Sequence, residues 1–208
     1  MSDTSFETPF EDTFKTIAKL SEGSYKDRSS KFLYFSFPVK NEEEIKEIQA
    51  ILRKKYYDAK HHCFAWALGK DAEHFRANDD GEPNHSAGDP ILGQIRSNKL
   101  TNILIVVVRY FGGTKLGMSG LIQAYKTSAA LAIGENEIIE EQVKVTVSVN
   151  FPYPVMNEVM SLVKMHDLQI VAQEMNLDCQ ITLNFRAGLE DAILSALSAI
   201  QGLTLLTD

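Results

Sequence analysis

The hydrophobic positions in the first two thirds of the chain alternate between the spacing of strands and that of helices. The segment 102–111 contains the unbroken apolar run ILIVVV, which is typical of a central strand covered on both faces. In the segment 41–57, isoleucines and a leucine follow helical spacing, and Asn41 with Glu44 fits a capping box. The pattern thus predicts a mixed α and β domain. Strands are expected at 31–39, 63–68 and 102–111, and helices at 41–57, 90–98 and 119–133.

The last third of the chain has the pattern of a smaller, separate domain. Val143 to Val149 alternates valine with polar residues, as a half-buried strand does. The predicted order of elements is βαββαβ, which is the ferredoxin-like motif. The charged link 135–142 is expected to separate the two domains. After the first strand, the elements are expected at 154–165, 168–173, 177–185, 189–200 and 203–206.

The composition is that of a globular protein, with 44% hydrophobic and 24% charged residues among 208. The longest aliphatic run has six residues, and about 20 are needed to cross a bilayer, so no transmembrane helix is expected. Residues 1–14 lack the pattern of a secretory signal, and we interpret them as a loose tail. Cys63 and Cys179 form no CxxC motif, so a reduced, cytoplasmic setting is the default expectation.

The charge is divided unevenly along the chain. Residues 1–135 carry 18 acids and 18 bases, whereas residues 136–208 carry 10 acids and 3 bases and account for the net charge of −7. This division supports two modules with different surfaces. The isoelectric point near 5.3 argues against a generic DNA-binding protein, but it leaves room for a local basic groove in the first module.

A glycine-rich turn, residues 109–120, lies between the predicted central strand and a helix. Its glycines allow close backbone approach, and the helix N-terminus with Arg109 and Lys115 has the features of an anion site. It is not a Walker A loop, because Met118 stands where lysine is required. A tight turn that needs glycine only for packing would explain the same pattern. The residues expected at an anion or nucleic-acid site are Arg109, Gly112, Gly113, Lys115, Gly117 and Lys60.

The polar loop 78–88 carries three acids, Asp79, Asp80 and Glu82. Carboxylates could hold Mg²⁺, but the EF-hand spacing is absent and Asp-Asp-Gly is also ordinary turn chemistry, so we expect no metal site. If these acids lie close to Arg109 and Lys115, they would neutralise the basic groove and form an internal network of ion pairs.

Two further arrangements of reactive residues are weaker signals. His85 and Ser86 could form a base and a nucleophile, but adjacent residues need not face each other and no GxSxG motif occurs. The His-His-Cys segment 61–63 could bind zinc only if His85 or Cys179 completed the ligand set. Cys63 is expected to point into the core with Ala65 and Ala67. His62 would then face the other side of the sheet with Phe64 and Trp66.

Four segments together make the chain similar to a known family. They are YDAKHHC at 57–63, DDGEP at 79–83, AGDPIL at 87–92 and VRYFGGTKLG at 108–117. The chain resembles the IMPACT/YigZ family over about residues 20–135, and its second half resembles the small C-terminal domain of bacterial members. Departures from the family pattern include His85 and Ser86 in place of Gly-Thr, Ser119 in place of glycine, and Gln123 in place of an arginine.

The resemblance implies an α+β protein with two domains, at 15–138 and 139–208. The first would share the fold of a ribosomal-protein domain that is also domain IV of elongation factor G, and the second would be ferredoxin-like, similar to domain V of that factor. Both relatives act on RNA, and eukaryotic members of the family are linked to translational control. A role in translation, with RNA or the ribosome as partner, is therefore implied by analogy.

Three functions remain in competition. In the first, which we favour, the protein is a non-catalytic regulatory module that binds RNA or the ribosome, with no cofactor. In the second, the acidic domain or the face of His62 and Trp66 binds a protein partner without nucleic acid. In the third, a hydrolase-type enzyme uses the 79–88 loop. The groove of the first hypothesis would be lined by Arg109, Lys115, Lys60 and Arg76, and the acid–base candidates of the third are His85, Asp80 and Glu82.

Overall fold

The computed structural model describes residues 12–206 with the exception of residue 177. The chain divides into two compact units. The first is Phe14–Glu141, and the second comprises the described residues from Gln142 onward together with Asp12 and Thr13. Among the described residues, no helix is both long enough and apolar enough to span a membrane.

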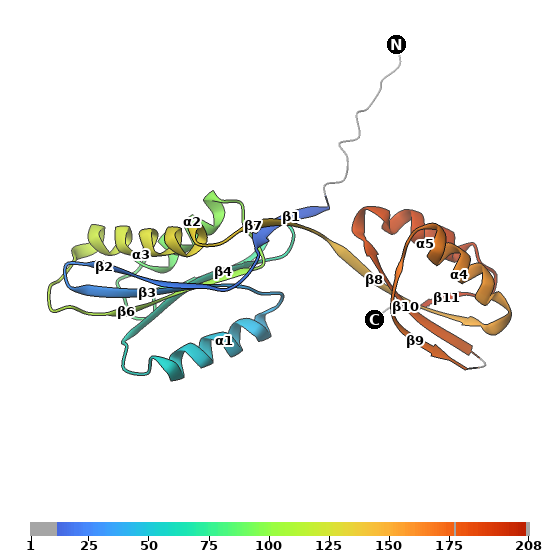
Figure 1. Cartoon of the computed structure of the whole chain (residues 1–208), viewed down its shortest axis with the longest axis horizontal. Coiled ribbons are helices and arrows are strands. Elements are labelled where there is room, and N and C mark those ends of the chain that lie inside the picture. The colour runs from blue at the N-terminus through green and yellow to red at the C-terminus, as the bar shows by residue number, and fades with distance from the viewer. Residues whose placement is uncertain (1–11, 177, 207–208) are drawn as a thin grey trace, which may run out of the picture. The chain divides into compact units, whose positions relative to one another are not determined.

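The first unit is built on a five-stranded antiparallel sheet with the strand order β2-β3-β6-β4-β5. Helices α2 and α3 cover one face of this sheet, and α1 covers the other (Figure 1). The strands are β2 (Ser21–Asp27), β3 (Ser30–Pro38), β4 (His61–Leu68), β5 (His74–Asn78) and β6 (Ile103–Tyr110). The helices are α1 (Glu42–Lys55), α2 (Gly88–Ser97) and α3 (Gly117–Gly134).

Strand β6 occupies the centre of this sheet. Its residues from Ile103 to Val108 are each at most 1% exposed. Ile105 and Val107 pack in the core on the side of α2 and α3, whereas Leu104 and Val106 pack on the side of α1. The prediction of a central strand covered on both faces is confirmed.

Four strands have no counterpart in the sequence prediction. The two edge strands, β2 and β5, have few apolar residues, as is common at the edges of a sheet. The other two, β1 (Thr13–Ile17) and β7 (Ile138–Gln142), form a two-stranded sheet with each other. Most of the predicted charged link 135–142 is therefore strand.

The predicted loose tail, residues 1–14, lies outside the described residues up to position 11. Its last residues differ from the prediction, because Thr13 and Phe14 begin β1. Asp12 is buried, and its carboxylate accepts hydrogen bonds from the Arg186 side chain and from the Gly188 amide. The hydrogen bond from Arg186 is the main reason that the pKa of Asp12 is lowered to about 2.

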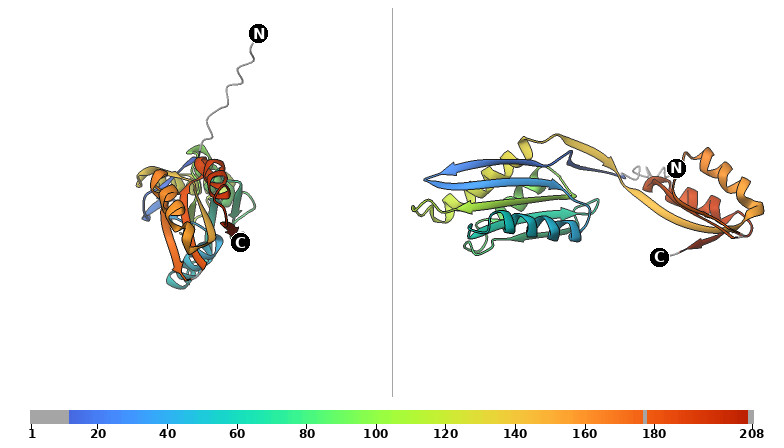
Figure 2. Two further views of the ribbon diagram at one scale, coloured as in Figure 1. Left: turned by 90° about the vertical axis from the view of Figure 1, so that its right-hand side faces the viewer. Right: turned by 60° about the horizontal axis from the view of Figure 1, so that its bottom comes forward.

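The second unit has a four-stranded antiparallel sheet with the order β11-β8-β10-β9. The predicted sequence of elements, βαββαβ, is observed, with α4 and α5 on one face of the sheet (Figure 2). Alternate residues such as Phe151, Ile181 and Leu183 form the core beneath the helices. The elements are β8 (Lys144–Pro152), α4 (Met156–Met165), β9 (Gln169–Met175), β10 (Asp178–Arg186), α5 (Glu190–Ser198) and β11 (Thr204–Leu206).

The loop after β6 passes directly against the hairpin that joins β2 to β3. A methyl group on Gly112 would lie 2.0 Å from the carbonyl carbon and oxygen of Ser29. The absence of a side chain at this position therefore lets the two loops meet.

We expect Gly112→Ala to lower the free energy of unfolding by about 1–3 kcal/mol, because the backbone must move to accommodate the methyl group. The matched control is Gly93→Ala in α2, where nothing lies within 4 Å of the added methyl. That change should stabilise the protein by about 0.5–1 kcal/mol. Urea denaturation of both variants tests the prediction, and equal stabilities would contradict it.

Candidate nucleic-acid interface

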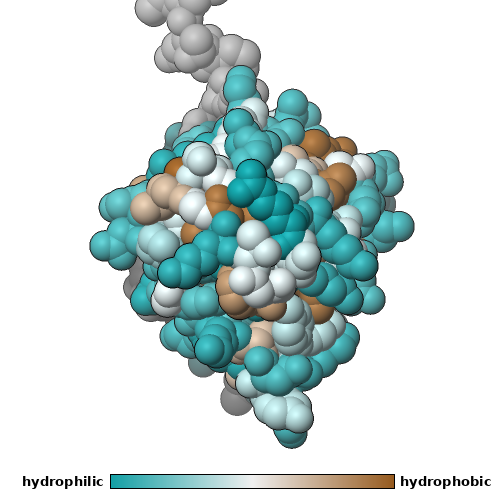
Figure 3. Space-filling model, turned by 90° about the vertical axis from the view of Figure 1, so that its left-hand side faces the viewer, coloured by the Kyte–Doolittle hydropathy of each residue, from teal (hydrophilic) through white to brown (hydrophobic). Residues whose placement is uncertain are grey.

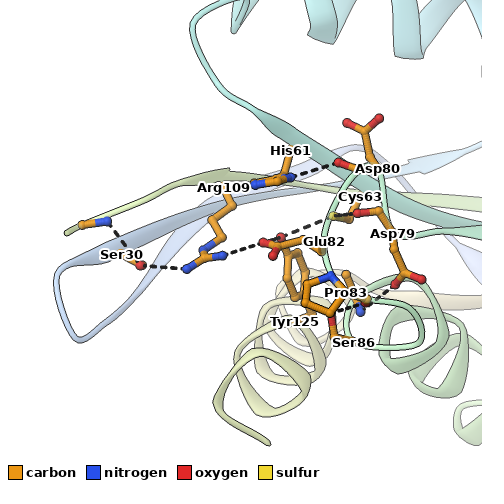
Figure 4. Close-up of polar contacts among 12 residues, drawn as sticks. Ser30, His61, Cys63, Asp79, Asp80, Glu82, Pro83, Ser86, Arg109 and Tyr125 are labelled. Atoms are coloured by element: carbon orange, nitrogen blue, oxygen red, sulfur yellow. Dashed lines mark hydrogen bonds and ion pairs between the residues drawn. The ribbon is translucent and has the colours of Figure 1, made fainter. Parts of the chain in front are cut away.

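A buried ion pair connects the polar loop to the central strand. Nη1 of Arg109 donates to Oε1 of Glu82 at 2.7 Å, and the two side chains are only 7% and 4% exposed. The hydroxyl of Tyr125 on α3 donates to the same oxygen at 2.8 Å. Figure 4 shows Arg109 directed at Glu82 with one nitrogen and at Ser30 with another. Glu82 thus neutralises the charge of Arg109 inside the protein.

The other two acids of the loop hold its backbone in place. The carboxylate of Asp79 accepts hydrogen bonds from the amides of His85, Ala87 and Gly88, at the start of α2. The carboxylate of Asp80 accepts from the amide of His62. The Arg53 side chain also donates to it, at 2.7 Å. Burial raises the pKa of Asp80, but these hydrogen bonds and the charge of Arg53 outweigh burial and hold it below the usual range.

The structure does not bring the acid–base candidates together. Nδ1 of His85 lies 2.6 Å from the carboxylate of Asp89, on the surface, and this hydrogen bond raises the pKa of His85. The hydroxyl of Ser86 donates to the carbonyl of Pro83, not to His85. Glu82 and Asp80 bind different arginines. Within residues 12–206, residue 177 apart, no three metal-ligating side chains cluster, so neither the magnesium nor the zinc interpretation gains support.

Alternate side chains of β4 point to opposite faces of the sheet, as the sequence predicted. Cys63 lies in the core on the side of α2 and α3, with Ala65 and Ala67. Burial raises the pKa of the Cys63 thiol. His62 and Trp66 are buried on the side of α1 and are 5% and 6% exposed. The idea that this face binds a protein partner is therefore wrong, because α1 already covers it.

The glycine turn leads into a helix that begins two residues earlier than predicted, at Gly117. Gly113 and Gly117 have positive φ angles of 88° and 74°, which explains glycine at these two positions. No side chain caps the N-terminus of α3, and its first turn contains no acid. The free amides and the helix dipole there favour an anion.

Two surface hollows meet at this turn. One, of about 350 Å³, is lined by Lys115 and the start of α3 together with Glu82 and Arg109. The other, of about 440 Å³, is lined by Lys60, His61 and Arg109. Phe111 lines both. The structure therefore places Lys60, Arg109 and Lys115 around one region.

Arg76, in contrast, does not join this region. Arg76 on β5 lies opposite Trp66 on β4. Trp66 is five residues along β4 from His61, which lines one of the hollows. That separation is about 17 Å. Three of the four expected cations thus lie in one region, and one of these three, Arg109, is already paired with Glu82.

Sequence reasoning missed several other cations at this end of the sheet. The β2–β3 hairpin, the connection from α1 to β4 and the loop from β6 to α3 all lie there (Figure 1). None of the cations forms an ion pair within the described part of the chain. Together with the predicted Lys60 and Lys115, these cations make a group of seven that we call the basic end: Lys26, Arg28, Lys31, Lys54, Lys55, Lys60 and Lys115.

Figure 3 looks directly onto the basic end. The surface is mainly hydrophilic, but separate hydrophobic patches interrupt it. The large apolar side chains exposed at this end include Phe111, Met118 and Tyr57. The hairpin cations and these apolar residues belong to one surface because β2 pairs with β3 and β3 pairs with β6, and the sequence alone does not show this pairing.

We expect Glu82→Gln to lower the free energy of unfolding by about 3–5 kcal/mol, because it leaves the Arg109 charge buried without a counterion. Asp89→Asn removes the exposed partner of His85 and serves as the control, which should unfold like the wild type. Chemical denaturation measures both. A Glu82→Gln protein as stable as the control would show that the pair is not a structural constraint.

A second stability test concerns His62, whose pKa is lowered by burial. The unfolded chain therefore binds a proton at a higher pH than the folded one. The stabilisation that neutral His62 supplies is complete above the ordinary histidine pKa of about 6.5 and is lost as the pH falls below it. We expect the free energy of unfolding to fall less steeply in His62→Gln than in the wild type between about pH 7.5 and 5. Parallel pH profiles would contradict this assignment.

Comparison with known proteins agrees with the motifs around this site. Residues 28–133 match the family model of the Impact N-terminal domain. The IMPACT family member YvyE of Bacillus subtilis (strain 168) is 33% identical over 130 residues, which are 62% of this chain and 60% of that protein. An IMPACT family member of Haemophilus influenzae is 28% identical over 177 residues, which are 83% of this chain and 82% of that protein.

A solved structure shows the same overall fold. It is the crystal structure of a hypothetical protein, with a TM-score of 0.73 and 24% sequence identity, and the match covers 95% of this chain and 98% of that one. The family model spans more than half of the sequence and establishes the relationship. The chain belongs to the IMPACT/YigZ family.

Proposed function

We propose that this protein is a non-catalytic RNA-binding protein, associated with the ribosome, that regulates translation. The observation that carries the proposal is the basic end, a group of seven cations at one end of the sheet. Two of them, Lys60 and Lys115, line the two hollows beside the uncapped N-terminus of α3. Lysine and arginine side chains that neutralise phosphates supply most of the affinity in nucleic-acid binding.

The local balance of charge favours phosphate. Of the nearby acids, Glu82 is neutralised by Arg109, and the carboxylate of Asp58 accepts a hydrogen bond from the hydroxyl of Tyr110. Two more acids lie on β2: Asp27 at its end, and Glu22, whose charge acts on Lys55. The seven cations of the basic end therefore outnumber the acids around them, although the whole protein carries a net charge of −7.

Two further points support this function. Eukaryotic members of the family are linked to translational control, which favours a role in translation. The strand order β11-β8-β10-β9 supports a ferredoxin-like fold for the second unit. With a first unit like domain IV of elongation factor G, the two domains would resemble parts of a factor that works on the ribosome. Such a function would place the protein in the cytoplasm.

A protein partner is the second candidate, and one observation in the second unit favours it. A hollow of about 430 Å³ lies on α4 and α5, and Met165 at its edge is 77% exposed. Residues 142–208 contain seven acids and three bases, so phosphate would be repelled there. A protein, not RNA, would bind this surface.

We expect a short single-stranded RNA to bind with an affinity that falls as the salt concentration rises, measured by fluorescence anisotropy. The double variant Lys60→Ala/Lys115→Ala should bind more weakly. Its slope of log affinity against log salt should be smaller by about one for each lysine that touches a phosphate. The control is Lys144→Ala/Lys164→Ala in the second unit. Binding that is insensitive to salt, or equal in both double variants, would refute the proposal.

A further inference from the structure

We propose that the basic end recognises single-stranded RNA by stacking an unpaired base on the ring of Phe111. This inference rests on the proposed function, since it specifies the kind of RNA that the same surface binds. In this inference Phe111 binds the base, whereas the cations bind the phosphates.

Phe111 is an exposed aromatic residue at an exceptional place in the fold. It is the first residue after β6, and 55% of it is exposed although it follows the most deeply buried strand of the sheet. The guanidinium carbon of Arg109 lies 5.6 Å from the centre of its ring and 5.6 Å from the centre of the Phe32 ring. Because Glu82 anchors that guanidinium, the cation–π contact gives the Phe111 ring a fixed support from within the protein.

The two hollows give the ring its surroundings. Phe111 lines both of them, with Lys60 in one and Lys115 in the other. A base that stacks on this ring therefore has a lysine on each side to receive the flanking phosphates. An aromatic platform between cations is the arrangement by which proteins hold single strands, because every base has a flat face that can stack.

Double-stranded RNA fits this arrangement poorly. Its bases are already stacked, and proteins contact it through phosphates and 2′-hydroxyls in the minor groove. A rigid, exposed ring would have no base to receive in a duplex. Tyr57 adds to the argument, because it is 84% exposed in the turn before Lys60 and offers a second aromatic surface at the same end.

The test compares two probes with equal charge but different bases. One is a fluorescent oligouridine of about 12 nucleotides, and the other is an abasic ribose-phosphate strand of the same length. Phe111→Ala should weaken binding of oligouridine by about 5- to 150-fold, the effect of losing one stacked base. It should leave binding of the abasic strand unchanged, and Phe111→Trp should restore the affinity for oligouridine.

Phe75→Ala is the matched control. Phe75 is also exposed and also contacts a guanidinium, that of Arg96 at 4.2 Å, but it lies on β5, away from the basic end. Its loss should change neither affinity. The unfolding midpoint of each variant confirms that the folded protein is being compared.

The possible outcomes separate this inference from the function on which it rests. If Lys60→Ala/Lys115→Ala weakens binding of oligouridine but Phe111→Ala does not, the RNA site stands and the stacking inference is overturned. Equal loss of oligouridine and abasic binding in Phe111→Ala, or tighter binding of a duplex of the same length, overturns it as well. If the wild type binds neither probe, both proposals fail.

Discussion

The buried ion pair between Glu82 and Arg109 joins three parts of the first unit that are distant in sequence: the polar loop, the central strand and, through Tyr125, helix α3. A charge on either side chain would be costly without the other, so the loop and the strand must meet at this point. The pair also means that the charge of Arg109 is already balanced by Glu82 within the protein. The Arg109 guanidinium supports Phe111, and the surface lysines carry the net positive charge.

The elements that could be predicted are those in which the pattern of apolar residues indicates which side chains are buried. Strand β6 was evident from its apolar run, and β8 and β10 from their alternation, because each contributes a full row of side chains to a core. Strands β2 and β5 were not evident, because they contain few apolar residues and so show neither an apolar run nor an alternation. The pairing of β1 with β7 joins segments more than 100 residues apart, and no periodicity encodes it.

The same distinction applies to the site. The glycine turn drew attention to Arg109 and Lys115 because glycine and charge occur together in a short segment. That Glu82 neutralises Arg109 depends on a contact between residues 27 positions apart. The possibility that loop acids meet Arg109 was open from the sequence, but Lys115 has no such partner among the described residues. Lys26, Arg28 and Lys31 went unnoticed because the hairpin that carries them was itself not predicted.

The central claim is that one end of the first sheet, and no part of the acidic second unit, binds RNA. The most direct measurement is a titration of the isotope-labelled protein with short single-stranded RNA, following backbone amide resonances by NMR. We expect shifts to be concentrated at residues 26–31, 54–61 and 111–120, with residues 142–206 unaffected. Shifts centred on α4 and α5, or no shifts at any position, would contradict the account.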